Sequence, residues 1–191
     1  MVELYWIPLG AGAHVVRWSG RIFEALLASW QRRPRHDLYH AALIVRAPDG
    51  EYVVEQAPVP DGHGERRGVV AGGPVGMRFL GRWRVFRYEV RRWRGGSIPD
   101  LHAAVGGPVR VGDAELAARV LDVLEGIPTP VWGRDELRAG EMWNSNSVVA
   151  WTLVRAGVDV DGVGLPARGR APGWTAGVTV ARRTTRGGQA R

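Results

Sequence analysis

The strongest constraint in the sequence is a turn between two apolar runs in residues 38–57. Pro48-Asp49-Gly50 has a typical turn composition, and apolar residues dominate positions 41–45 before it and 52–54 after it. Because so short a connection joins only antiparallel strands, the segment predicts a β-hairpin. Residues 83–93 predict another strand, since apolar and charged side chains alternate there. Its expected buried face consists of Phe86, Tyr88 and Val90.

Helical spacing elsewhere predicts helices that pack on this sheet. Residues 15–30 favour one bent helix, or a turn followed by a helix, because Ser19-Gly20 interrupts the pattern. Asp113 is a good N-cap for a helix that reaches Glu125, and residues 146–156 predict a helix that ends before Gly157. Short strands are expected at 3–8 and 177–180, and an exposed loop at 58–76. The expected fold class is α+β, a small antiparallel sheet packed against helices, with one domain at 1–181 and a disordered Arg-rich tail at 182–191.

Composition excludes several kinds of site. The 191-residue chain has no cysteine, so disulfides, thiolate metal sites and cysteine nucleophiles are ruled out. No HExxH, EF-hand loop or phosphate-binding loop occurs, and neither a metal nor a cofactor is expected. The N-terminus has an acidic Glu3 where a signal peptide needs positive charge, and no run approaches the about 20 apolar residues of a membrane span. A cytoplasmic location without a membrane span is therefore expected.

The net charge of +7 comes from 26 basic residues, all of them arginine. An anionic partner such as nucleic acid is one interpretation, and a coding bias that replaces lysine by arginine is the other. The arginines are scattered, and only the last ten residues resemble a basic tail. Coding bias is therefore the favoured interpretation, and nucleic acid ranks last among the partners.

His40 begins the first strand of the hairpin, and Glu55 lies in the returning strand. Folding at Asp49-Gly50 brings the two ends together. A histidine oriented by a polar residue on the neighbouring strand is the base-and-orienter pair of nucleophilic catalysis. Gln56 is the alternative orienting residue, and a purely structural role for His40 also stays open.

A run of small polar residues, Asn144-Ser145-Asn146-Ser147, opens the late helix. A nucleophile at a helix N-terminus gains from the helix dipole, and free N–H groups there can form an oxyanion hole. Each of the four residue types is also a good N-cap, so helix capping is the competing interpretation.

The order of these residues resembles the circularly permuted NlpC-type branch of the papain-like superfamily, which includes lecithin:retinol acyltransferase-like proteins. In that group a His starts a strand, a polar residue follows on the next strand, and an Asn-Cys pair opens the helix. Residues 144–151 look like that opening in a bacterial variant, with Ser145 at the cysteine position. The resemblance covers residues 36–60 and 141–157 and implies a permuted papain-like core. It also implies Ser145, His40 and Glu55 as catalytic residues, with substrate-binding side chains at Tyr39, Trp143, Asn144 and Asn146.

Three functions remain in competition. The first is a papain-like-fold hydrolase or acyltransferase homologue acting on an amide or ester. Serine at the cysteine position makes weak activity the expectation, because a hydroxyl is a much weaker acid than a thiol. The second is a non-catalytic peptide- or lipid-binding module on the same fold, and the third is an Arg-rich nucleic-acid binder. Oligomeric state is left open.

Overall fold

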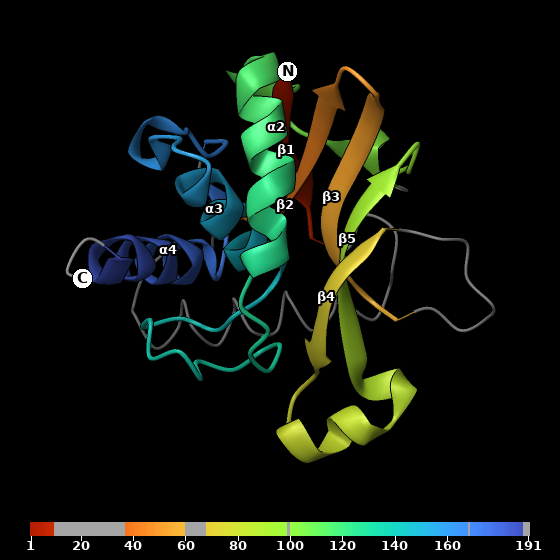
Figure 1. The fold of residues 1–191 in the computed structure, drawn as a ribbon, viewed down its shortest axis with the longest axis vertical. Helices are drawn as coiled ribbons and strands as arrows, with labels where there is room; N and C mark the ends of the chain where they lie inside the picture. The colour runs from red at the N-terminus through yellow and green to blue at the C-terminus, as the bar shows by residue number, and fades with distance from the viewer. Residues whose placement is uncertain (10–36, 60–67, 99, 168, 189–191) are drawn as a thin grey trace.

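The computed structural model describes residues 1–9, 37–59, 68–98, 100–167 and 169–188 (Figure 1). The helix expected over residues 15–30 lies outside the described residues. Six strands form an antiparallel sheet, and the two-residue β7 (Gly169–Arg170) joins β2 in parallel. The order across the sheet is β4 (Val69–Pro74), β5 (Arg87–Arg94), β3 (Gly50–Pro58), β2 (Asp37–Ala47), β1 (Val2–Pro8) and β6 (Val109–Gly112).

The central hairpin is confirmed. β2 and β3 pair from Leu43–Val54 to Ala47–Gly50, with the turn at Pro48-Asp49. β1 pairs antiparallel with β2 on the other side. Side chains alternate across the pleat, so one face of these strands supplies the core cluster. Its central members are Val2, Leu4, Trp6, Ala41, Leu43, Val45 and Val54, all buried.

Three α-helices lie in the described residues: α2 (Ala114–Val123), α3 (Ser145–Arg155) and α4 (Trp174–Gly188). The fold is therefore mixed α/β with a mainly antiparallel sheet, as expected. Asp113 caps α2 by accepting from the N–H groups of Glu115 and Leu116, both at 3.1 Å. The buried stripe of α2 is Leu116, Ala117, Val120 and Leu121, which faces the sheet. None of the described helices is long and apolar enough to cross a bilayer.

Helices α3 and α4 pack closely against each other beside the sheet (Figure 1). Gly177 makes this approach possible, since a Cβ at that position would lie 2.2 Å from the carbonyl oxygen of Ser147. The strand predicted at 177–180 is therefore wrong. Its β-branched residues favour a strand locally, but packing on α3 selects the helix.

The same helix continues through residues 182–188, the first part of the predicted disordered tail. Arg182 pairs with Asp161 at 2.7 Å, and Arg183 donates to the carbonyls of Leu137 and Arg138 at 2.9 and 3.0 Å. These contacts hold two of the tail arginines against the body of the protein.

Two further differences concern the sheet edge. β4 lies within the predicted loop at 58–76, because its Gly- and Pro-rich sequence conceals the strand pattern. The strand predicted at 83–93 begins only at Arg87, and a short 3-10 helix, η2 (Arg84–Phe86), precedes it. Phe86 is consequently exposed, whereas Tyr88 and Val90 are buried as expected.

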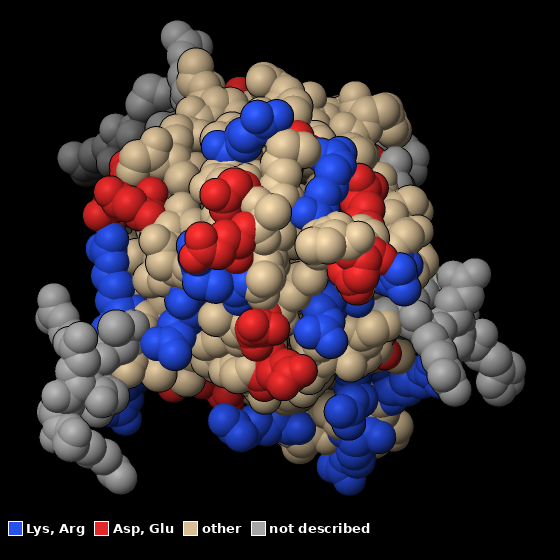
Figure 2. All heavy atoms as spheres, turned by 45° about the horizontal axis from the view of Figure 1, so that its top comes forward, with Lys and Arg blue, Asp and Glu red and all other residues tan. Residues whose placement is uncertain are grey.

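Acidic and basic side chains intermingle over the face that Figure 2 presents. Several arginines form ion pairs, among them Arg46 with both Glu3 and Glu51, and Arg119 with Glu115. These ion pairs offset part of the basic excess.

Candidate active site

The side chain of Asn146 joins α3 to the edge of β2 next to His40. Its Oδ1 accepts from the N–H of Ala41 at 2.7 Å, and its Nδ2 donates to the carbonyls of Tyr39 at 3.0 Å and Pro172 at 2.9 Å. The pairing of β2 with β3 begins only at Leu43, so these backbone groups of β2 are available to Asn146. Because Tyr39 and Ala41 flank His40, the same contacts fix α3 opposite that histidine.

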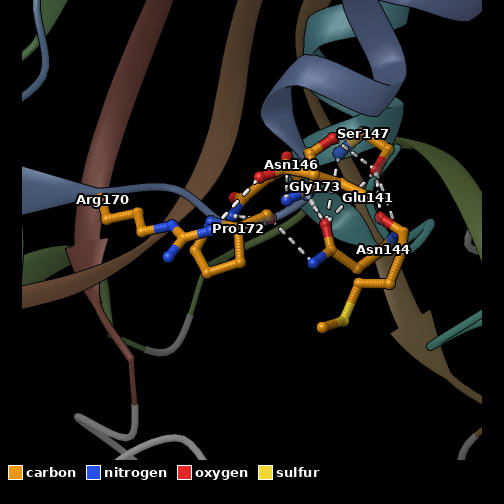
Figure 3. Close-up of polar contacts among 8 residues, drawn as sticks. Glu141, Asn144, Asn146, Ser147, Arg170, Pro172 and Gly173 are labelled. Carbon is orange, nitrogen blue, oxygen red and sulfur yellow. Dashed lines mark hydrogen bonds and ion pairs between the residues drawn. The ribbon is translucent and has the colours of Figure 1, made fainter. Parts of the chain in front are cut away.

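Asn144 and Ser147 cap α3 reciprocally (Figure 3). Asn144 Oδ1 accepts from the N–H groups of Asn146 and Ser147 at 2.9 and 3.3 Å, and Ser147 Oγ accepts from the N–H of Asn144 at 3.1 Å. The capping interpretation of the polar run is therefore right for these two residues. Ser145 takes no part in the capping box.

A short segment before α4 completes the support. Asn144 Nδ2 donates to the carbonyl of Pro172 at 2.8 Å, and Ser147 Oγ donates to that of Gly173 at 2.7 Å. Glu141 accepts from the N–H of Gly173 at 3.0 Å and pairs with Arg170 at 3.4 Å (Figure 3). The first turn of α3 is thus held from both sides by residues distant in sequence.

The pair His40 and Ser145 meets at this point. Nδ1 of His40 lies 2.8 Å from Oγ of Ser145, although the residues are 105 positions apart. Both residues are partly buried. Asn144 accepts from the N–H groups of Asn146 and Ser147, whereas no acceptor contacts the N–H of Ser145 among the described residues.

Burial lowers the pKa of His40 to about 4, and the opposing effect of the Asp100 carboxylate is smaller. The imidazole is therefore neutral at pH 7. A neutral imidazole carries one N–H, and the hydrogen bond fits the tautomer in which Nε2 is protonated and Nδ1 accepts from the Ser145 hydroxyl. Ser145 and His40 are arranged as a nucleophile and a base.

Glu55, the expected orienting residue, has a different contact. Its carboxylate pairs with Arg91 at 3.2 Å, and Arg91 also contacts Glu89 at 3.1 Å and the carbonyl of Pro58 at 3.0 Å. Within the described part of the chain, no hydrogen bond joins Glu55 to His40. Asp100 is the carboxylate that acts on His40 electrostatically, and sequence reasoning missed it because nothing in Asp100-Leu101-His102 resembles a catalytic motif.

The alternative orienting residue, Gln56, faces the core. It is paired in register with the fully buried Val90 and is 4% exposed. Neither of its amide atoms has a hydrogen-bond partner among the described residues. Gln56 is therefore an unsatisfied polar group in the core rather than a visible partner of His40.

The predicted substrate-binding residues have structural roles. Tyr39, Trp143 and Asn146 are buried in the core or at the α3–β2 contact, and Asn144 is the N-cap. Trp143 is 2% exposed and belongs to the core cluster. Trp151 is also buried in the core, whereas Trp132 packs edge-on against Tyr88 and Trp174 packs at a tilt against Trp6.

A cavity of about 830 Å³ lies at another part of the molecule, between the start of α2 and the end of α3. Met1, Gly112, Asp113, Arg119 and Gly157 are among its lining residues, and neither His40 nor Ser145 is. The described residues contain no group of three His, Asp or Glu side chains arranged to hold a metal ion.

No comparison with a known protein supports this arrangement. No family model matches the chain, and neither a curated protein nor a solved structure matches it.

Proposed function

We propose that the chain is a serine hydrolase or acyltransferase with a permuted papain-like, NlpC-like core, acting on an ester or amide. The observation that carries the proposal is the 2.8 Å contact between His40 Nδ1 and Ser145 Oγ at the first residue of α3. A strand histidine followed by a nucleophile at a late helix N-terminus is also the order that the resemblance implies. Ser145 is the proposed nucleophile and His40 the proposed general base.

The reaction follows from the positions of these atoms. Ser145 Oγ forms a bond to the carbonyl carbon of the substrate while its proton passes to Nδ1 of His40. The resulting oxyanion accepts from the N–H of Ser145 and is stabilised by the positive end of α3. The alcohol or amine then leaves with the proton from His40, and water or a second acceptor releases the acyl group by the same steps in reverse.

The environment of His40 limits this chemistry. Desolvation keeps its pKa at about 4, so the imidazolium that forms during attack is poorly stabilised. In the serine protease triad an Asp carboxylate is hydrogen-bonded to the histidine ring. In the described residues no carboxylate is hydrogen-bonded to the His40 ring. We therefore expect a slow enzyme in which His40, the general base, is deprotonated throughout the neutral pH range.

Labelling by a fluorescent fluorophosphonate, together with hydrolysis of short-chain p-nitrophenyl esters, tests the proposal. Ser145→Ala removes both signals, and His40→Ala lowers them by about a hundredfold or more, the usual contribution of a general base. Ser97→Ala is the matched control, since Ser97 is an exposed serine outside the α3 region. Equal labelling and turnover in all four proteins would refute a catalytic role for Ser145.

A non-catalytic ligand-binding module on the same fold is the second candidate. Two observations favour it: burial lowers the pKa of His40, which disfavours the imidazolium, and Glu55 pairs with Arg91 rather than with His40 among the described residues. Such a module gains thermal stability from an acyl or peptide ligand and turns nothing over. The nucleic-acid alternative loses weight, since Arg182 and Arg183 are already engaged with the protein.

A further inference from the structure

The connection between β4 and β5 is the most exposed apolar region of the described chain. We call residues 75–87 the β4–β5 tip; it contains η1 (Arg78–Arg82) and η2. Figure 1 shows the tip projecting beyond the end of the sheet, at the bottom of the view and away from α2. A hollow of about 440 Å³ lies at its base, where Gly76, Met77 and Arg78 face residues 131–136.

Five large apolar side chains of the tip face solvent. Their exposed fractions are Met77 46%, Phe79 56%, Trp83 47%, Val85 70% and Phe86 39%. Scattered single apolar residues are normal on a protein surface, but a contiguous group marks an interaction site. The five exposed side chains of the tip therefore indicate an interaction surface.

Polar contacts at its base hold the tip in place. Arg78 forms a two-pronged ion pair with Glu136 at 2.7 and 3.0 Å. Gly76 donates to the carbonyl of Trp132 at 3.0 Å and accepts from Arg134 at 2.8 Å. The apolar group is presented on a braced scaffold, which reduces the entropy lost on binding.

The charge of the tip is of one sign. The sequence has no acidic residue between Glu65 and Glu89, while Arg78, Arg82, Arg84 and Arg87 are all exposed. Glu136 offsets Arg78, and Arg82 stacks over Trp83 at 4.5 Å from the ring centroid. Arginine thus alternates with aromatic and aliphatic side chains over the whole protrusion.

We propose that the β4–β5 tip docks on the surface of an anionic lipid bilayer. Trp and Phe partition into the membrane interface, where their rings lie at headgroup level, and interleaved arginines bind the phosphates. A tip that projects beyond the sheet can enter the headgroup layer, whereas proteins that bind single-stranded nucleic acid carry the strand in a long positively charged groove. Met77 and Val85 also provide aliphatic surface on which no base stacks. This docking is independent of the chemistry proposed for Ser145.

Flotation of the full chain with liposomes tests the docking. The probes are vesicles of pure phosphatidylcholine and vesicles with an equal share of phosphatidylglycerol, each at low and at 0.5 M salt. The expected result is flotation with the anionic vesicles that weakens at high salt, because the arginine contribution is screened. Phe79→Ser with Trp83→Ser, and separately Arg82→Glu with Arg84→Glu, each lower the bound fraction by about tenfold or more.

Matched controls lie elsewhere on the surface. Leu165→Ser and Arg110→Glu change an exposed apolar and an exposed basic residue outside the tip and should leave flotation unchanged. Equal flotation of the tip variants and the controls would overturn the proposal, as would a lack of flotation by the unaltered chain. The proposal would also be overturned if the unaltered chain did not bind vesicles but self-associated or bound a single-stranded oligonucleotide, and if the tip variants alone lost that interaction.

Discussion

At the start of α3 polar side chains are buried, whereas at the β4–β5 tip apolar side chains are exposed. Both regions reverse the usual distribution, in which polar side chains lie at the surface and apolar side chains in the core. Asn146 and Ser147 are almost completely buried, and each of their side chains makes hydrogen bonds to backbone groups. The exposed rings of Phe79, Trp83 and Phe86 have no comparable cover from the described chain.

The difference separates a region whose polar groups find their partners within the protein from a region whose apolar side chains we propose to contact a membrane. Burying a polar group costs free energy unless it is hydrogen-bonded, and α3 meets that condition through β2 and the segment before α4. We expect the tip to contribute little to stability because its large apolar side chains are exposed, and the proposed docking would account for them. Substitutions in the first region should therefore destabilise the protein, and substitutions in the second should not.

Asn146→Ala should have the largest effect. It leaves the N–H of Ala41 and the carbonyl of Tyr39 without the Asn146 partner in a buried place, whereas the carbonyl of Pro172 keeps its hydrogen bond from Asn144. The expected loss is about 3–5 kcal/mol in the free energy of unfolding, since each unsatisfied buried group costs about 1–3 kcal/mol. Urea denaturation measures it, with Ser97→Ala as the control. A loss below about 1 kcal/mol would mean that Asn146 does not hold α3 to β2.

The pH dependence of stability should reveal the burial of His40. Its pKa is about 4 in the folded chain and about 6.5 when unfolded, so the unfolded state binds more protons between these values. Its contribution is fully present above pH 6.5 and is lost as the pH falls to 4, by up to about 3 kcal/mol. Urea denaturation of the unaltered chain and of His40→Gln gives the difference, from which the other titrating groups cancel. A difference that is constant from pH 7 to 4 would contradict the lowered pKa.

Gln56→Met should stabilise the protein by about 1 kcal/mol. The substitution keeps the size of the side chain and removes a buried amide that has no partner in the described residues. Thermal denaturation checks the sign. Destabilisation, or loss of ester hydrolysis without loss of stability, would instead give Gln56 the functional role that the sequence left open.

The smallest effect belongs to the tip. Phe79→Ser with Trp83→Ser should change the free energy of unfolding by less than about 0.5 kcal/mol, because both side chains are about half exposed. Chemical denaturation of the same protein used for flotation provides the value. A loss of 2 kcal/mol or more would show that the tip packs within the fold and would remove the contrast with α3.

Local sequence was sufficient to predict a structural element where one strong signal, such as a turn or a helix cap, was present. The turn at Pro48-Asp49-Gly50 predicted the hairpin, and Asp113 predicted the start of α2 within one residue. The proximity of His40 to Ser145 was expected only from the resemblance to the NlpC-type group, and the two side chains lie 2.8 Å apart. Whether the pair turns over a substrate stays a prediction.

Tertiary contacts decided the rest. Gly177 and its neighbours form a helix because they pack on α3, and Glu55 binds Arg91, a residue of a strand that no local pattern connects to it. Trp143 was expected to bind substrate, yet its side chain is buried in the core. Asp100 acts on His40 from a segment with no recognisable motif. Contacts of this kind depend on how distant segments meet, which spacing along the chain does not encode.

The most direct test of the Ser145–His40 pair is the pH dependence of iodoacetamide alkylation in Ser145→Cys. The chain has no other cysteine, so the reaction reports one site, and Ser97→Cys gives the ordinary thiol in the same protein. The account predicts an apparent thiol pKa below the usual value of about 8.5, and a rise toward that value when His40→Ala is added. A pKa equal to that of Ser97→Cys or higher, and indifferent to His40, would contradict it and leave Ser145 as a surface residue of a capped helix.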